Sequence, residues 1–390
     1  MATAVRTPAN ASPVLRGEEA RVTPLELFFD LVFVFALTQV TATMADDPTW
    51  AGLGRGMLVL AAVWWAWVGY AWLTNLVDPD SVRNRLVVFA AMAALLVVAL
   101  AVPQAFGADA WLFAIAYALV RVTHIVLLSG GVRGTDNAAA GRRLAVTATI
   151  GPALILAAAP FDGATQYILW GAALAIDYAG PLFPGQSGWT VHAGHFAERH
   201  GLIVIIALGE SLVALGVGAN DLEVDALLAV GAALGIAVIA ALWWAYFDVV
   251  ALVAERKLHE AQGAARGRMA RDSYSYLHLP MVAGIVLLAL GLKKVLGHVD
   301  EPLKLAMSTA LFGGVALYLL AHVAFRLRNV GTWSKRRVLV SALCLAAIAP
   351  ATEVDALWAL TALAAMLGTL VTYEAVRFRD ARAQVRAAAH

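Results

Sequence analysis

The amino-acid sequence predicts an all-α integral membrane protein of about 12 transmembrane helices, arranged as two parallel six-helix repeats with both termini cytoplasmic. Three observations lead to this prediction. Of the 390 residues, 61% are hydrophobic and 14% are charged, whereas soluble domains are about a quarter charged. Apolar stretches long enough to cross a bilayer recur along the whole chain. Lys and Arg residues gather in alternate connecting segments.

The predicted spans follow from the apolar stretches, because a transmembrane helix needs about 20 mostly apolar residues. The twelve windows lie near residues 23–44, 55–76, 85–106, 110–130, 143–160, 165–183, 200–218, 225–251, 274–296, 303–326, 337–353 and 355–378. The predicted domains are a disordered cytoplasmic tail (1–22), a first repeat (23–183), a cytoplasmic connector (184–199), a second repeat (200–378) and a cytoplasmic tail (379–390).

The basic residues give the predicted orientation. If the N-terminus is inside, 23 of the 28 Lys and Arg residues fall in cytoplasmic segments, four fall in outer loops and Arg121 falls within a span. Short cytoplasmic loops of multi-spanning proteins are enriched in Lys and Arg. A missed or extra helix in the middle of the chain would destroy this bias, so both termini are predicted to be cytoplasmic.

Segments of the first half resemble segments of the second half in the same order. "AAVWWAWVGYA", which begins at Ala61, resembles "AALWWAYFDVV", which begins at Ala240. "RRLAVTATIGPALILAAAP", from Arg142, likewise resembles "RRVLVSALCLAAIAP", from Arg336. Matches in one order favour a duplication, and six spans per half make the two repeats parallel. The "WWAW" and "WWAY" clusters are expected to form aromatic belts at the membrane surface, with Asp248 as a solvated helix end.

Ionisable side chains within the spans are candidate functional residues. Each costs roughly 2.5–3.5 kcal/mol at the bilayer centre, so such groups are expected to face the bundle interior. One interpretation makes Glu210, Arg121 and Asp177 a cluster that contacts substrate or couples protons. The structural alternative is a buried ion pair of Arg121 with Asp177 or Glu210 that only holds helices together. The remaining candidates at depth are Gln39, His124, Ser211 and His322.

The proposed duplication adds weight to Glu210. "ALTQVT", from Ala36, aligns with "ALGESL", from Ala207, so Gln39 is the counterpart of Glu210. One half therefore carries a neutral amide where the other carries an acid. A carboxylate in a low-dielectric environment can carry a proton near neutral pH. This asymmetry favours a central site with one charge-bearing wall.

The cytoplasmic ends of the first and seventh spans carry further charges. Thr23 followed by Glu26 matches a capping box, so Glu26 is expected to help begin a helix. Asp30 lies deeper on the same helix face and needs a cation, for which Arg199 or His200 is the natural candidate. Such a pair could be a structural contact or a gate that breaks during transport.

The segment "HAGHFAERH" presents possible metal ligands. His192, His195 and Glu198 are spaced three apart, and imidazole and carboxylate groups suit zinc or a similar ion. The same spacing also describes one face of a helix, without any metal.

The two charged segments carry a family resemblance. "TPLELFFDLVFVFALTQVT" from Thr23 and "HFAERHGLIVIIALGES" from His195 resemble motifs of the bacterial low temperature requirement A family. The resemblance implies a multi-spanning bacterial inner-membrane protein, and the family has no settled biochemical activity. It places weight on the residues at the matching motif positions, namely Glu26, Phe29, Asp30, Gln39, His195, Glu198, Arg199, His200, Gly209, Glu210 and Ser211.

The leading functional hypothesis is a secondary transporter, not an enzyme, for a small solute and with proton coupling as an option. The alternatives are a sensor or assembly factor, and an enzyme or redox protein acting on a lipid or quinone. In the redox version, His124 and His322 would ligate a haem. No cofactor is otherwise indicated, and a net charge of +1 gives no argument for a nucleic-acid partner.

Overall fold

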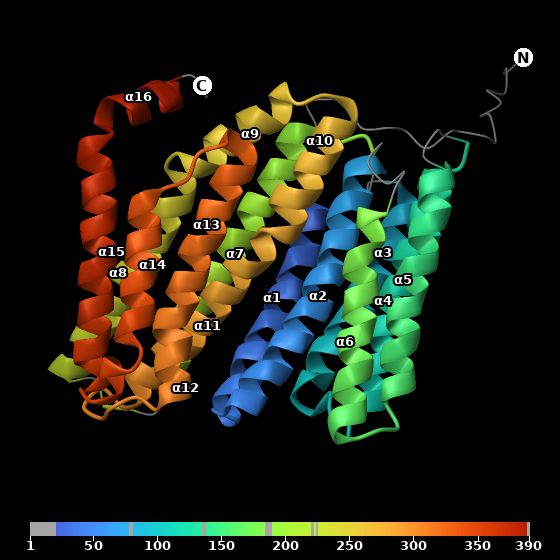
Figure 1. The fold of residues 1–390 in the computed structure, drawn as a ribbon. Helices are drawn as coiled ribbons and strands as arrows, with labels where there is room; N and C mark the ends of the chain where they lie inside the picture. The colour runs from blue at the N-terminus through green and yellow to red at the C-terminus, as the bar shows by residue number, and fades with distance from the viewer. Residues whose placement is uncertain are drawn as a thin grey trace, which may run out of the picture.

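The computed structural model describes residues 21–77, 81–134, 138–183, 189–219, 222–223 and 225–387. Within these residues the protein is helical, with one isolated bridge between Pro302 and Asp355 and no strand. The long helices lie roughly side by side in Figure 1. Helices satisfy their own backbone hydrogen bonds, which is what a chain in lipid requires.

The helices fall into two consecutive groups. The first group is α1 (Pro24–Asp46), α2 (Trp50–Leu76), α3 (Val82–Ala101), α4 (Ala110–Gly131), α5 (Ala138–Ala158) and α6 (Gly163–Ala179), with the 3-10 turns η1 (Val102–Gln104) and η2 (Gly180–Leu182). The second group begins with α7 (Ala193–Ala219), α8 (Ala226–Phe247), α9 (Val250–Glu260), α10 (Gly263–Met269), η3 (Ala270–Tyr276) and α11 (His278–Gly297). It continues with α12 (Leu305–Ser308), η4 (Thr309–Gly313), α13 (Gly314–Val330), α14 (Lys335–Ala347), η5 (Pro350–Thr352), α15 (Ala356–Arg377) and α16 (Arg379–Ala387).

Nine helical segments of the described chain are long and apolar enough to cross a membrane. The protein is therefore a multi-pass membrane protein. The three other predicted spans fall on α5, α6 and α14. The last two contain only 17 and 13 residues, and α5 carries Arg142 and Arg143 near its start.

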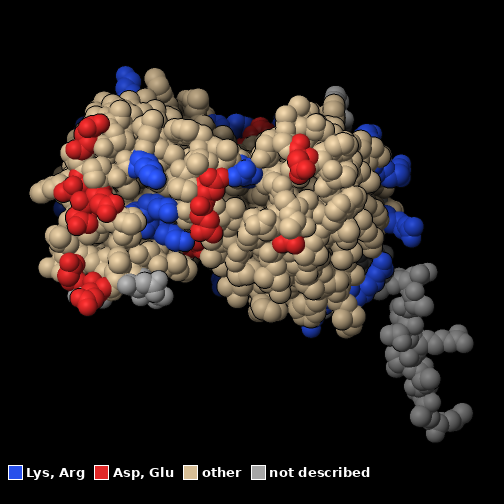
Figure 2. All heavy atoms as spheres, turned by 90° about the horizontal axis from the view of Figure 1, so that it is seen from below, with Lys and Arg blue, Asp and Glu red and all other residues tan. Residues whose placement is uncertain are grey.

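The two groups form two neighbouring lobes. In the first, α1 packs against α2 and α3, α3 against α4, α4 against α5, α5 against α6, and α6 reaches α2. In the second, α7 packs against α8 and α11, α11 against α13, α13 against α14, α14 against α15, and α15 reaches α8. The lobes meet where α1 and α2 contact α7 and α11. Figure 2, seen from below, shows a furrow between them with acidic and basic side chains along it.

Close helix packing in the second lobe depends on glycine. A Cβ atom on Gly284 of α11 would lie 2.5 Å from the backbone oxygen of Gly314 on α13. A side chain at this point would collide with backbone and force the helices apart. Small residues of this kind let helices in membranes approach each other closely.

One of the two tryptophan clusters differs from its prediction. Trp64, Trp65 and Trp67 of α2 are buried, so the prediction of an aromatic belt was wrong for "WWAW". The indole nitrogens of Trp64 and Trp67 donate hydrogen bonds to other helices, which explains how these side chains are accommodated inside the bundle. Trp243 and Trp244 of α8 are 44% and 39% exposed. That exposure agrees with a belt.

Asp248, predicted to be a solvated helix end, is instead covered. Its carboxylate forms ion pairs with Arg382 and Arg386 of α16, and its side chain is only 8% exposed. The prediction failed because α16 folds back over the end of α8, at the upper end of the molecule in Figure 1. α16 lies at the same end as α9 and α10.

Candidate functional site

The candidate site begins at the first turn of α1. The backbone nitrogen of Thr23 donates to Glu26 Oε2 at 2.8 Å, and the backbone nitrogen of Glu26 donates to Thr23 Oγ1 at 3.4 Å. This is the predicted capping box, with Pro24 in the first turn. Glu26 also has a second contact, because its Oε1 lies 2.9 Å from His195 Nε2 on α7. Glu26 therefore both begins α1 and joins it to α7.

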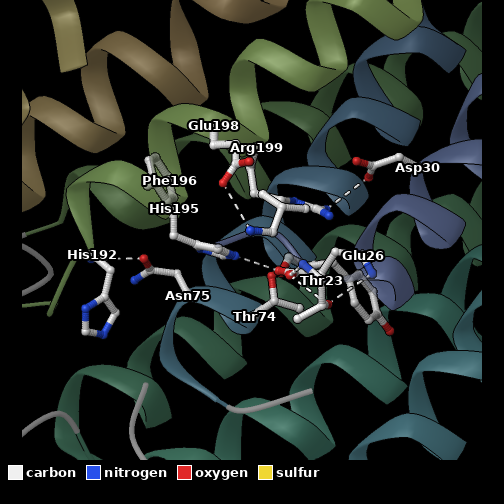
Figure 3. A network of polar contacts seen from close by, with 12 residues as sticks. Thr23, Glu26, Asp30, Thr74, Asn75, His192, His195, Phe196, Glu198 and Arg199 are labelled. Atoms are coloured by element: carbon white, nitrogen blue, oxygen red, sulfur yellow. Dashed lines mark hydrogen bonds and ion pairs between the residues drawn. The ribbon is translucent and has the colours of Figure 1, made fainter. Parts of the chain in front are cut away.

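One helical turn deeper, Asp30 and Arg199 form a buried ion pair. Arg199 Nη2 donates to Asp30 Oδ1 at 3.0 Å, and both side chains are almost fully buried. Figure 3 shows the two contacts between α1 and α7 beside each other. Of the two cations expected near Asp30, Arg199 makes the contact. The other, His200, uses Nδ1 to contact the Phe196 backbone oxygen at 2.8 Å.

Trp67 contacts both members of this pair and was not among the residues predicted from the sequence. Its indole nitrogen donates to Asp30 Oδ1 at 2.8 Å. Its ring also lies 5.5 Å from the guanidinium carbon of Arg199, within range of a cation–π contact. The sequence signal was present in "WWAW", because these residues lie near the middle of the predicted span 55–76, whereas aromatic belts lie at the ends of spans.

We define the α1–α7 ion-pair network as Glu26, His195, Asp30, Arg199 and Trp67. Each of its two ion pairs, Glu26 with His195 and Asp30 with Arg199, joins one residue of the first lobe to one residue of the second. Several polar atoms nevertheless lack a hydrogen-bond partner among the described residues: Asp30 Oδ2, Arg199 Nε and Arg199 Nη1. Buried pairs with unsatisfied atoms contribute little net stability, but removing one partner alone is strongly destabilising. The two ion pairs thus hold the beginning of α1 against α7.

The predicted metal ligands do not converge. In the described parts of the chain, no three His, Cys, Asp or Glu side chains are placed to hold a metal ion. Helix α7 begins at Ala193, so His192 lies outside the helical face that the spacing suggested. The ring of His192 points away from His195 in Figure 3. Glu198 accepts a hydrogen bond from the backbone nitrogen of Val22 at 3.0 Å.

Deeper in the same interface lies Glu210, which is 3% exposed. The hydroxyl of Thr38 on α1 donates to its carboxylate. No basic side chain within the described residues forms an ion pair with Glu210. Lys293 of α11 acts on it only at longer range. This buried acid is therefore held by a hydroxyl group and not by a base.

Two other candidate residues are related to Glu210: Gln39 is its counterpart in the proposed duplication, and Ser211 follows it in the sequence. Gln39 is half-buried next to Thr38, and its backbone oxygen accepts a hydrogen bond from Thr43. Ser211 is fully buried, and its hydroxyl lies 3.5 Å from the Ile285 backbone oxygen, the outer limit for a hydrogen bond.

Arg121 pairs with Asp177, not with Glu210. Arg121 Nη2 lies 3.0 Å from Asp177 Oδ1, and the two side chains are 4% and 2% exposed. This pair joins α4 to α6 within the first lobe. Glu210 lies on α7 in the second lobe and takes no part in the pair. The single three-residue cluster predicted from the sequence is therefore not formed, and the geometry matches the structural alternative for this pair.

His124 and His322 have separate surroundings. His124 of α4 packs beside Tyr70 and lines a narrow cavity with Trp65 and Trp72. His322 of α13 contacts the Tyr318 backbone oxygen through Nδ1 at 2.9 Å. Their neighbours differ, so these contacts do not support a shared haem.

Comparison with known proteins places these residues in a family. The family described as "Bacterial low temperature requirement A protein (LtrA)" matches residues 21–372, which include the whole α1–α7 interface. A relative in Rhizobium meliloti (strain 1021), an uncharacterized protein named RA0937, is 30% identical over 307 residues, or 75% of this chain and 74% of that protein. No solved structure matches the chain. The chain therefore belongs to the bacterial low temperature requirement A family.

Proposed function

We propose that this protein is a secondary transporter of the bacterial inner membrane that couples the movement of a small solute to that of protons, with Glu210 as the proton carrier. The observation that carries the proposal is the environment of Glu210. A buried carboxylate held by a hydroxyl can gain or lose a proton without breaking an ion pair. It lies where the two lobes meet, and ionisable groups at such depth are commonly parts of proton pathways.

The proposal includes twelve spans in two parallel six-helix repeats, with both termini cytoplasmic. The packing within each lobe supports this, because the neighbours of α1, α2, α3, α4, α5 and α6 correspond in order to those of α7, α8, α11, α13, α14 and α15. In this scheme α5, α6 and α14 complete the spans, and α1 faces its own counterpart α7. Transporters built from parallel repeats bind substrate near the midplane between the halves.

The α1–α7 ion-pair network is proposed as the cytoplasmic gate. Its contacts cross from one lobe to the other, so rocking of the lobes would separate Glu26 from His195 and Asp30 from Arg199. With these contacts closed, access is expected from the opposite end, where the furrow of Figure 2 separates the lobes. Alternating access in transporters with repeats is largely a rigid-body movement of this kind.

Reconstituted protein tests the proposal. Proteoliposomes containing an internal pH indicator would be given solutes grouped as organic anions, organic cations, zwitterions and sugars. We expect at least one group to drive proton movement with the wild-type protein and none with Glu210→Gln. Glu301→Gln, which changes a 68% exposed acid at the far end of the molecule, is the matched control and should behave as wild type. If no group moves protons, the transporter proposal fails.

A further inference from the structure

Helix α7 has a second side that the α1–α7 network does not use. Ala197, Glu198 and Gly201 follow Gly194 by three, four and seven residues, so all four share one side of the helix. They line a groove of about 580 Å³ between α7 and the α8–α9 segment. Small-molecule sites commonly measure about 300–1,000 Å³. The groove therefore has room for a ligand.

The small residues of α7 create the space in this groove. A Cβ atom on Gly201 would lie 3.6 Å from the ring of Phe247 on α8. A Cβ atom on Gly194 would lie 3.7 Å from Glu255 Oε1 on α9. Any larger side chain at these two positions would project toward the opposite wall.

Three aromatic residues are among those that line the groove. Tyr246 and Phe247 come from the end of α8, and Tyr274 comes from the π-helical segment η3. Tyr274 is 1% exposed, and its hydroxyl has no hydrogen-bond partner among the described residues. Segments of π-helix occur frequently at functional sites. The hydroxyl of Tyr274 is thus an unused polar group at the inner end of an apolar wall.

Two carboxylates give the groove its charge. Glu198 of α7 and Glu255 of α9 lie on opposite walls and are close enough to repel each other. Glu255 has a weak contact with His259 at 4.0 Å, and Glu198 accepts one backbone hydrogen bond. Arg21 is also present in the lining, so the formal charge with neutral histidine is −1.

We propose that this groove binds an organic cation, namely an amine with an apolar body. The ammonium group would lie between Glu198 and Glu255, and the apolar body would lie on the partly exposed ring of Phe247, because aromatic faces and carboxylates both attract cations. This site goes beyond the proposed function and does not depend on transport. Its Glu198 is adjacent in sequence to Arg199, so an occupant would contact the same turn of α7 that makes the gate pair.

Calorimetric titration of the purified full-length protein in nanodiscs tests the site. The probes are 2-phenylethylamine, its neutral analogue 2-phenylethanol and the anion phenylacetate. We expect saturable binding of the amine only. Glu255→Gln should weaken amine binding about tenfold because it removes a charge-assisted hydrogen bond. Arg21→Gln should strengthen it, because Arg21 repels a cation.

Two further variants separate binding from folding. Glu260→Gln removes a 52% exposed acid from the same helix α9 but outside the groove lining, and should leave amine binding unchanged. Gly201→Leu should abolish binding by filling the groove, with little change in thermal unfolding. The proposal is overturned if the alcohol binds as tightly as the amine, if Glu255→Gln and Glu260→Gln have equal effects, or if the amine shows no saturable binding.

Discussion

The interface between α1 and α7 contains two regions in which buried acids have different partners. Near the first turn of α1, Glu26 contacts His195 and Asp30 pairs with Arg199. About two turns further along α1, Thr38 donates a hydroxyl hydrogen bond to Glu210, and no base is paired with that acid in the described structure. The same two helices therefore hold acids with bases at one end and an acid without a base at the other.

The difference separates two kinds of buried charge. An acid that faces a base is costly to neutralise, because the base is then left buried and unpaired. An acid that faces a hydroxyl leaves no such charge behind. The first region is thus suited to holding the lobes together and the second to exchanging a proton. Substitutions at the two regions should have very different effects on stability.

The largest effect is expected from Arg199→Met. This change leaves the Asp30 carboxylate buried with only the Trp67 hydrogen bond. Breaking a buried pair on one side typically costs about 3–5 kcal/mol. We expect a loss of that size in the free energy of unfolding, measured by SDS titration of the detergent-solubilised protein with tryptophan fluorescence.

The double variant Asp30→Asn with Arg199→Met is the control for this prediction. Removing both charges should recover a large part of the lost stability, because no unpaired charge remains. If the single and double variants are equally destabilised, the cost comes from lost packing of the arginine side chain and not from the buried acid.

A smaller effect is expected from Trp67→Phe. Phenylalanine keeps an aromatic ring beside Arg199 but cannot donate to Asp30, whose second oxygen has no partner in the described structure. Loss of a hydrogen bond to a charged group costs about 1.5–3 kcal/mol. Trp65→Phe is the comparison, since Trp65 is also buried but packs on Tyr178. Equal losses would show that size and not hydrogen bonding decides the effect.

The contrast between these tryptophans also shows what the sequence could and could not predict. The capping box of Thr23 and Glu26 depends on residues three apart, and local spacing is enough to predict it. The contact of Asp30 with Arg199 was anticipated as one of two options, because a buried acid needs a cation. The first prediction thus needs only local spacing, and the second needs only the chemistry of a buried acid.

The partners of Trp67 and Arg121 depend instead on how helices pack. "WWAW", near the middle of α2, is buried against other helices, whereas "WWAY", near the end of α8, contains the exposed Trp243 and Trp244. Arg121 had two acids at suitable depth, and only the arrangement of the helices in the first lobe brings Asp177 to it. Residue depth along a span is readable from sequence, but the direction of a side chain around its helix is not.

A still smaller effect on stability is expected from Thr38→Val. The Glu210 carboxylate loses its hydroxyl donor, but a proton can be taken up in its place. Once Glu210 is protonated, the lost hydrogen bond is one between neutral groups, which contributes about 1 kcal/mol. The free energy of unfolding should therefore fall by about that amount. A fall as large as that of Arg199→Met would mean that Glu210 is held permanently as a charge.

The smallest effect on stability is expected from Glu210→Gln. The amide keeps the size of the side chain and can still accept the Thr38 hydrogen bond. Because no buried base loses its partner, the free energy of unfolding should change by less than about 1 kcal/mol. Asp30→Asn is the matched change at the other region, and it should cost about 3–5 kcal/mol because Arg199 is left unpaired. Both substitutions are measured by the same SDS titration. Equal costs would show that Glu210, like Asp30, stays ionised in the folded protein. Glu210 could not then exchange a proton in the way proposed.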